Sequence, residues 1–290
     1  MDPEEFYGNY KGHKLNHLEK IYNHFISKNP NQKFIYLAGD SSLDNKFWIL
    51  TEKSPAPNSH KDFFNPQIMV QDIAYHINNL TKNDEYVAIN CAVEASTLGE
   101  RVSTNNNNLL EQDVFIRNHI KGDDILIVSC GGNDLALMPS LTTIFNMFKI
   151  LITNLSEISP ETSGMPHFIE IFKHFTEKYI KSLTMKNKPS KVLVCGMYFP
   201  DENQTNSWAN TSLQLLNYNK NPVKIQNIIG ALFKFATSNI KVSNINIVPV
   251  PMFKVLDGKN TQDYDNRVEP SVIGGKKLCS LFLKMAKIQK

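Results

Sequence analysis

The chain has 290 residues, 41% of them hydrophobic, which is enough apolar content for a sizeable core and argues against extensive disorder. Its 31 basic and 28 acidic residues leave a formal net charge of +3, so neither a nucleic acid nor an anionic membrane is expected as a partner. No run approaches the ~18 consecutive apolar residues of a membrane span, and the acidic, polar start of the chain is not typical of a secretory signal.

The cysteines favour a reducing compartment. Three of the four end apolar β runs, where a small buried thiol is the common expectation. None has the Cys-x-x-Cys spacing of a metal site, and we expect no metal. We therefore predict a cytoplasmic protein. The four residues are Cys91, Cys130, Cys195 and Cys279.

Short apolar runs alternate with amphipathic segments along the chain. In chain order, the predicted elements are a helix at Leu15–Ser27, a strand at Phe34–Ala38, a helix at Ile68–Leu80, a strand at Tyr86–Cys91, a helix at Leu109–His119, a strand at Ile125–Ser129, helices at Leu141–Ile158 and His167–Leu183, a strand at Val192–Cys195, a helix at Val223–Thr237, a strand at Ile245–Val248 and a helix at Ser271–Ile288.

This alternation predicts an α/β protein. Continuous apolar strands separated by helices are typical of a parallel sheet covered on both faces. Five strands predict a doubly wound, flavodoxin-like three-layer α/β/α sandwich. No linker-like Pro/Gly/Ser tract divides the chain, so we expect a single domain over residues 1–290, with residues 1–30 as a helical N-terminal extension. Ligands of such sheets sit outside the carboxyl ends of the strands.

Gly39-Asp40-Ser41 directly follows the first predicted strand. Glycine permits a tight strand-to-helix turn that lifts a hydroxyl out of the sheet. A serine there can attack a carbonyl if a neighbouring base removes its proton. The plainer interpretation is an ordinary turn in which Asp40 or Ser41 caps the next element.

Two further loops offer hydrogen-bond donors. Gly131-Gly132-Asn133-Asp134 follows the third strand, and the Asn133 amide is suited to stabilising an oxyanion. The alternative is a turn made of common turn-forming residues. Ala95, in the loop after the second strand, offers a backbone N–H.

Together these segments resemble the SGNH hydrolase (GDSL esterase/lipase) superfamily. Gly39-Asp40-Ser41-Ser42-Leu43 is similar to its first block, and Gly131-Gly132-Asn133-Asp134 to its third. The resemblance implies an SGNH hydrolase fold over most of the chain, with Ser41 as nucleophile. It also implies an oxyanion hole made by the N–H groups of Ser41 and Ala95 and the side chain of Asn133.

The chain departs from the family pattern at two points. The family usually has glycine where Ala95 stands, a mild change because the backbone N–H remains. Its last block is Asp-x-x-His, but here Glu269 stands in place of the histidine and Asn266 in place of the aspartate. One bacterial subgroup resembles this chain in carrying Glu-Pro-Ser here.

Glu269 is the first candidate for the base. An unperturbed glutamate has a pKa of about 4.3 against about 6.5 for histidine, so it is the weaker base unless burial raises its pKa. Asp265 or Asp263 would orient it. Alternatively, Glu269 only favours the final helix through the helix dipole. A distant histidine is the other candidate base, with His60 the most plausible.

Three functional hypotheses follow. The first is a serine esterase or lipase-like hydrolase that acts on a small-molecule carboxylic ester, without a cofactor. The second is a catalytically inactive ligand- or partner-binding protein of the same fold, motivated by the missing histidine. The third, a flavodoxin-like nucleotide binder, has no Gly-x-Gly-x-x-Gly or P-loop in its support. Phe47, Trp48, Met252 and Phe253 are candidates to line an acyl pocket. The oligomeric state is left open.

Overall fold

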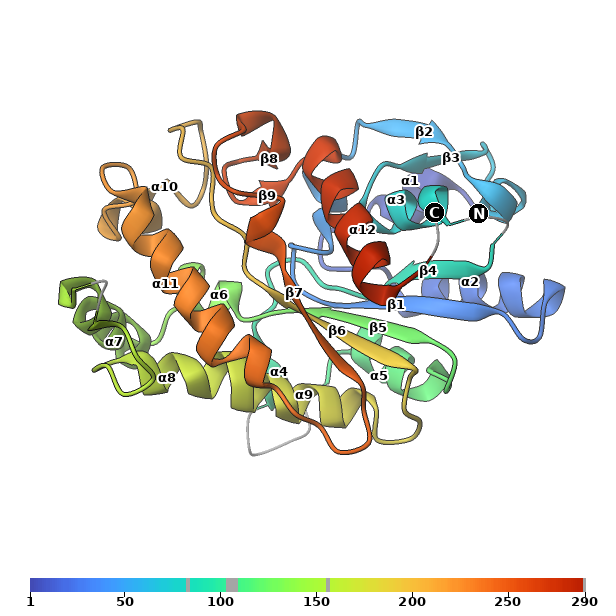
Figure 1. Cartoon of the computed structure of the whole chain (residues 1–290). Coiled ribbons are helices and arrows are strands. Elements are labelled where there is room, and N and C mark those ends of the chain that lie inside the picture. The colour runs from blue at the N-terminus through green and yellow to red at the C-terminus, as the bar shows by residue number, and fades with distance from the viewer. Residues whose placement is uncertain (82–83, 103–108, 155–156, 289–290) are drawn as a thin grey trace.

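Five parallel strands form the central sheet of the structure, a computed structural model that describes residues 1–81, 84–102, 109–154 and 157–288. The strands run in the spatial order β4-β1-β5-β6-β7 (Figure 1). They are β1 (Lys33–Gly39), β4 (Tyr86–Asn90), β5 (Ile125–Ser129), β6 (Lys191–Gly196) and β7 (Ile247–Pro251). This order confirms the predicted flavodoxin-like sheet.

The strand order reverses beside β1. The second strand of the sheet, β4, pairs with one edge of β1, and the third, β5, pairs with the other. Leu37 is therefore in register with Asn90 on one side and Ile127 on the other. The loops after β1, β4 and β5 leave the sheet at neighbouring points, and this is where ligands bind in such folds.

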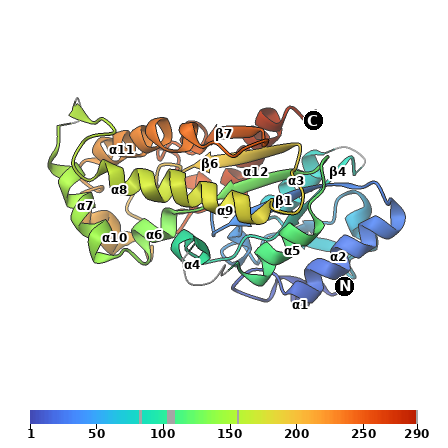
Figure 2. The same ribbon diagram turned by 90° about the horizontal axis from the view of Figure 1, so that it is seen from below.

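Helices cover both faces of the sheet, as predicted. Side chains alternate along β1, so that Ile35 and Leu37 join one core cluster while Phe34 and Tyr36 join the other. Helices α3 (Ile73–Leu80) and α12 (Val272–Ala286) pack on the first face. Figure 2 shows helices of the second face in front of the sheet. That layer contains α2 (Leu15–Lys28), α5 (Glu111–His119), α8 (Met165–Ile169), α9 (Thr176–Leu183) and α11 (Pro222–Phe235).

Several smaller elements complete the structure. The predicted helix His167–Leu183 is a continuous segment in which a π-helical turn, Glu170–Phe175, joins α8 to α9. The predicted helix Leu141–Ile158 ends earlier, at Ile152, and residues 155–156 lie outside the described residues. The other elements are α1 (Pro3–Tyr7), α4 (Leu98–Val102), α6 (Gly132–Ala136), α7 (Leu141–Ile152), α10 (Asn210–Leu215), β2 (Lys53–Pro55), β3 (Ile68–Val70), β8 (Tyr264–Asp265) and β9 (Glu269–Pro270).

Two further predicted boundaries were wrong. The first residues of the predicted helix Ile68–Leu80 form β3, which pairs with β2, and α3 begins only after Asp72, whose carboxylate accepts the Tyr75 N–H at 2.8 Å. The last strand was predicted at Ile245–Val248 but runs from Ile247 to Pro251. Its prolines are tolerated because β7 lies at the edge of the sheet.

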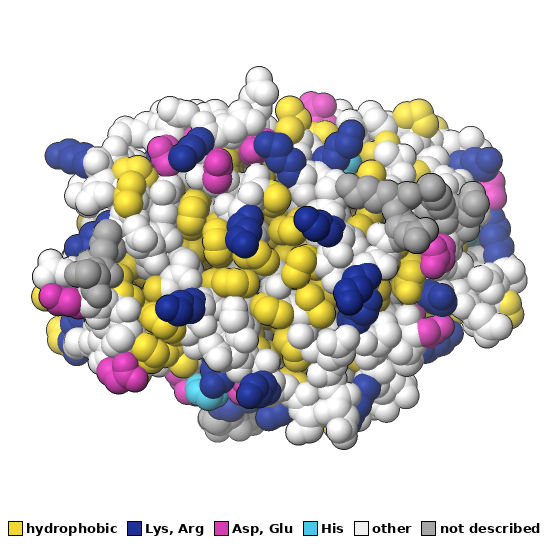
Figure 3. All heavy atoms as spheres, in the orientation of Figure 1, with side chains coloured by type: hydrophobic (Ala, Val, Ile, Leu, Met, Phe, Trp, Pro, Cys, Tyr) yellow, Lys and Arg dark blue, Asp and Glu magenta, His cyan; other side chains and the backbone are white. Residues whose placement is uncertain are grey.

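The face of the molecule seen in Figure 1 carries Lys and Arg side chains singly among apolar ones (Figure 3). Such a distribution is typical of a solvated exterior. Within the described residues, no helix has the length and apolar character needed to cross a membrane. Over the same residues, no group of three or more His, Cys, Asp or Glu side chains is placed to hold a metal ion, and the four cysteines form no disulfide.

Candidate active site

The turn that carries Ser41 requires glycine at its start. Gly39 ends β1 with a φ of +134°, a backbone conformation that residues with a side chain rarely adopt. A Cβ on this residue would lie 1.6 Å from the Ser129 carbonyl oxygen. The same oxygen accepts the Asp40 N–H at 3.1 Å, so β1 and β5 stay in contact up to the turn. The chain therefore turns sharply at the point where Ser41 leaves the sheet.

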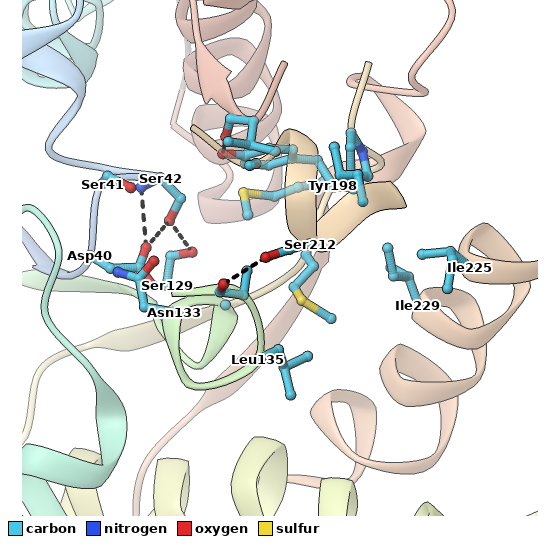
Figure 4. A pocket seen from close by; sticks show the side chains of 18 of the residues that line it. Asp40, Ser41, Ser42, Ser129, Asn133, Leu135, Tyr198, Ser212, Ile225 and Ile229 are labelled. Atoms are coloured by element: carbon cyan, nitrogen blue, oxygen red, sulfur yellow. Dashed lines mark hydrogen bonds between the residues drawn. The ribbon is translucent and has the colours of Figure 1, made fainter. Parts of the chain in front are cut away.

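Hydrogen bonds of Asp40 and Ser42 stabilise the turn, and the Ser41 side chain takes no part in them. The Asp40 carboxylate accepts the Ser42 N–H at 3.1 Å and the Ser42 hydroxyl at 2.7 Å, and the Ser42 oxygen lies 2.6 Å from the Ser129 hydroxyl. Burial raises the pKa of Asp40 to about 6, against the lowering effect of the Ser42 bonds. Asp40 thus has the capping role of the plainer interpretation, whereas the Ser41 side chain lines a pocket (Figure 4).

Asn133 lies in the same pocket as Ser41 (Figure 4). It stands in the first turn of α6, directly after β5. One N–H of its amide donates to the Ser96 carbonyl at 2.9 Å, and a primary amide has a second N–H. Asn133 is therefore oriented by the loop after β4 and still has a donor for a ligand.

Ala95 lies in that loop, between two residues that hydrogen-bond to the turn that carries Ser41. The Val93 N–H donates to the Gly39 carbonyl at 2.9 Å, and the Ser96 hydroxyl donates to the same oxygen at 3.2 Å. Ala95 has a φ of +58°, the left-handed conformation that glycine adopts most easily. Ala95 itself is not among the residues that line the pocket.

Two backbone donors next to this turn have no acceptor. Among the described residues, neither the Ser41 N–H nor the Ala95 N–H makes a hydrogen bond. Ser41 is buried, and nearly all buried backbone N–H groups in folded proteins are paired, so its N–H is a free donor at the pocket. Ala95 is only partly buried, and its N–H lies in the loop beside the pocket rather than in the pocket lining.

Glu269 is buried at the edge of the same pocket. It belongs to β9, and the Asn45 amide donates to the next carbonyl, that of Pro270, at 2.9 Å. Burial raises the pKa of Glu269 to about 8, and the negative charge of Asp40 adds to this, while hydrogen bonding from the Ser41 and Trp208 side chains lowers it. Oε1 accepts the Trp208 indole N–H at 3.2 Å. Oε2 lacks a hydrogen bond of standard geometry within the described residues.

Trp208 was not predicted from the sequence, because nothing in its neighbourhood distinguishes it. Its loop is attached to the turn between β8 and β9 by the buried guanidinium of Arg267. That group donates to the Asp201 carbonyl at 3.0 Å and to the Asn210 side chain at 2.7 Å. The loop that carries Trp208 is thus held by the same turn that precedes Glu269.

Glu94 is a second buried carboxyl that the sequence did not single out. Its backbone N–H donates to the Asp44 carboxylate at 3.1 Å, and its side chain is 3% exposed. Burial and the charge of Glu269 raise its pKa to about 9. The two glutamates therefore influence each other's protonation, although Glu94 does not line the pocket.

The aspartates named as candidates to orient the base differ in position. Asp265 is directly opposite Glu269 in the β8–β9 pair, and its charge raises the pKa of Glu269. Its carboxylate accepts the Asn266 amide at 2.8 Å rather than bonding to Glu269. Asp263 forms an ion pair with Lys277 at 2.6 Å. The side-chain hydrogen bond of standard geometry to Glu269 comes from Trp208 instead.

No histidine lines the pocket that contains Ser41, and all eight lie in the described residues. His60, the alternative base, is fully buried against Phe25, with ring centroids 4.7 Å apart. Burial lowers its pKa to about 4, and neither ring nitrogen has a hydrogen-bond partner among the described residues. His60 is therefore a core residue of another region.

The residues suggested for an acyl pocket also need correction. Met252 lines the pocket, but Phe47, Trp48 and Phe253 do not. Phe47 is 47% exposed and packs edge-on against Tyr10, with ring centroids 4.7 Å apart. Phe253 stacks on Phe199. The apolar lining comes instead from helices that the sequence did not associate with the site.

Comparison with known proteins gives only distant likenesses. No protein-family model matches the sequence, and neither does any curated protein. Similar solved structures include a catalytic mutant of Axe2, an acetylxylan esterase from Geobacillus stearothermophilus, with 11% identity over 89% of this chain and 95% of that chain and a TM-score of 0.45. An extracellular lipase from Streptomyces rimosus has 11% identity over 88% and 99%, with a TM-score of 0.42.

The protein YXIM from Bacillus subtilis has 12% identity, with a TM-score of 0.43. The match covers 89% of this chain but only 56% of YXIM, so this chain spans about half the length of that protein. Other similar structures are described as SGNH-hydrolase and GDSL-lipase candidates. At such identities and TM-scores these likenesses carry nothing about the chemistry of this chain, for which only its own residues count.

Proposed function

We infer that the protein is an ester hydrolase of the SGNH type that acts on a carboxylic ester through Ser41. The observation that carries this proposal is that Ser41, Asn133 and Glu269 line one pocket at the carboxyl edge of the sheet. A hydroxyl, an amide donor and a buried carboxyl are the groups that acyl transfer needs.

In the proposed reaction, Ser41 Oγ attacks the ester carbonyl while its proton passes to the Glu269 carboxylate. The oxyanion that forms is held by the Asn133 amide and the unpaired N–H groups of Ser41 and Ala95. Glu269 then returns the proton to the leaving alcohol, and the acyl group stays on Ser41. Water, deprotonated by Glu269, attacks the acyl-enzyme and releases the acid, so that Ser41 regains its proton.

The raised pKa makes Glu269 a usable base. With a pKa of about 8 rather than its ordinary value, its carboxylate is a stronger base, and this form predominates above about pH 8. The weakness expected of a glutamate from its unperturbed pKa is thus offset by burial. The absence of histidine from the pocket leaves Glu269 as the proposed acceptor.

The test compares three proteins on short p-nitrophenyl esters and with a fluorophosphonate probe. The wild type is expected to hydrolyse the esters and to be labelled at Ser41. Ser41→Ala is expected to lose both properties, and Glu269→Gln to lose about 10²–10⁴-fold in kcat with its fold intact. Hydrolysis by Ser41→Ala at the wild-type rate would refute the proposal.

A second candidate is a catalytically inactive protein of the same fold that binds a ligand in this pocket. The lack of any histidine beside Ser41 favours it. It predicts no labelling of the wild type by the fluorophosphonate and no ester hydrolysis at any pH between 6 and 10 (about two units on either side of the Glu269 pKa).

A further inference from the structure

The pocket continues from Ser41 into a chamber with apolar walls. One wall comes from α11, which contributes Ile225, Ile229 and Leu232. Further apolar lining comes from Met147 of α7, Phe168 of α8 and Leu213 of α10. Figure 4 shows Ile225 and Ile229 across the pocket from the group of Asp40, Ser41 and Asn133.

Polar groups are concentrated at one end of this chamber. Asp40, Ser41, Ser42, Asn133 and Glu269 all stand at the carboxyl edge of the sheet. The Ser212 hydroxyl, which lies between Asn133 and Ile229 in Figure 4, already donates to the Ala136 carbonyl at 3.1 Å. A molecule that fills the chamber must therefore have a polar group at Ser41 and a continuous apolar group beyond it, since burying a second polar group there is costly.

The volume sets the size of that apolar group. The pocket measures about 170 Å³. A cavity of about 150 Å³ lined by Leu, Ile and Phe accepts benzene, so this one, which includes the space beside Ser41, has room for about six carbons. Acetyl or methyl groups would leave most of it unfilled.

We propose that this chamber binds an alkyl group of about six carbons attached to the ester. This deepens, and rests on, the proposed function. The chain is on the acyl side or on the alcohol side of the ester; both present the same apolar surface to α11 and α10. Each methylene that enters the chamber should raise kcat/KM about fourfold, the factor that corresponds to its burial.

The first experiment measures kcat/KM of the wild type along two ester series. Methyl esters from acetate to decanoate vary the acyl side, and acetate esters from methyl to decyl vary the alcohol side. We expect a rise in one series until the chamber is full, and a flat response in the other; the rising series identifies the side of the ester that enters. Two flat series would overturn the proposal.

A pair of variants on one helix tests the location. Ile229→Trp places a large ring in the chamber and should reduce kcat/KM for the hexanoate or hexyl ester at least about tenfold more than for methyl acetate. Val223→Trp is the matched control, because Val223 is a β-branched residue of α11 that is 54% exposed and outside the pocket. Equal chain-length profiles for the two variants would contradict the assignment.

A binding measurement that does not depend on catalysis separates the hydrolase proposal from the alkyl-site proposal. Calorimetry measures the binding of 1-octanol to Ser41→Ala; a neutral ligand is used because the pocket carries carboxyl groups. Octanol should bind to Ser41→Ala more tightly than 1-butanol does. The double variant Ser41→Ala with Ile229→Trp should not bind octanol. If octanol binds while the wild type hydrolyses no ester, the hydrolase proposal fails and the alkyl site stands. If esters are hydrolysed with no chain-length preference and octanol does not bind, the alkyl site fails alone.

Discussion

Trp208 donates its indole N–H to Oε1 of Glu269 at 3.2 Å, across 61 residues of sequence. This bond holds one oxygen of the carboxyl and leaves the other without a hydrogen bond of standard geometry among the described residues. In enzymes that use a base of this kind, a third group orients it toward the nucleophile. Here a neutral indole occupies the place that the sequence suggested for an aspartate.

Replacing Trp208 should therefore change the pH profile. In the wild type, kcat/KM should rise with pH as Glu269 loses its proton, around its pKa of about 8. The Trp208 bond lowers that pKa, so Trp208→Phe should move the rise to higher pH by roughly half a unit to one unit, since one hydrogen bond is worth about 1 kcal/mol and one pKa unit ~1.4 kcal/mol.

Trp48→Phe is the control, because the chain has only two tryptophans and Trp48 does not line the pocket. Its profile should match the wild type. A Trp208→Phe profile that is lower in amplitude but unshifted would mean that the indole does not act on Glu269.

Removing the Asn133 amide should slow the chemical step. We expect Asn133→Ala to lower kcat about 10²–10³-fold with a smaller change in KM, since the donor is needed most when the oxyanion forms. Its lost bond to the Ser96 carbonyl should also cost about 1 kcal/mol in the free energy of unfolding. Asn146→Ala, at a partly exposed position of α7 outside the pocket lining, should leave kcat unchanged and cost less stability, because its amide donates only to the Thr142 carbonyl at the surface. Equal kcat values for the two variants would argue against an oxyanion hole.

The Glu94 carboxyl should make the protein less stable at alkaline pH. Burial and the Glu269 charge raise its folded-state pKa from an ordinary 4.5 to about 9, so the folded protein holds a proton that the unfolded chain releases. Stability is then fully present below the unfolded pKa and is lost as pH rises toward the folded pKa. Glu94→Gln should raise Tm by roughly 5 °C at pH 9 and hardly at all at pH 4.

The matched control for this series is Glu85→Gln, at an exposed carboxyl, whose Tm should follow the wild type at both pH values. A Tm for Glu94→Gln that differs from the wild type by the same amount at both pH values would show that the titration of Glu94 has no part in stability.

Two glycines with opposite surroundings test the geometry of the nucleophile turn. Gly39→Ala should destabilise the fold by more than about 4 kcal/mol, because its Cβ would lie 1.6 Å from the Ser129 carbonyl oxygen at a φ of +134°. Gly230→Ala, in α11, meets no heavy atom within 4 Å and should stabilise by about 0.5–1 kcal/mol. Urea unfolding measures both. Similar stabilities for the two variants would mean that β1 and β5 are not in contact at Gly39.

Much of the sheet was predictable from local pattern. Phe34–Ala38 and Ile125–Ser129 are continuous apolar runs of strand length, and both became strands of the buried sheet with nearly the predicted bounds. The errors fell where a contact distant in the chain decides the outcome. Ile68–Val70 has helical apolar spacing with Ile73, yet it pairs with Lys53–Pro55 as a strand.

The residues of the candidate site also fall into two groups, those that local sequence predicted and those that only the structure revealed. Ser41 and Asn133 were found because glycine-containing turns after strands have a recognisable local form, and strand ends meet at one edge of a parallel sheet. Local sequence therefore determined which side chains leave the sheet at that edge. Trp208, Glu94 and the wall of Ile225 and Ile229 have no such signal. Their roles arise from burial, from charges brought close by folding, and from the packing of α10 and α11 beside the strand ends. These are properties of the folded environment, so only the tertiary structure could give Glu269 its raised pKa and Ser41 its apolar chamber.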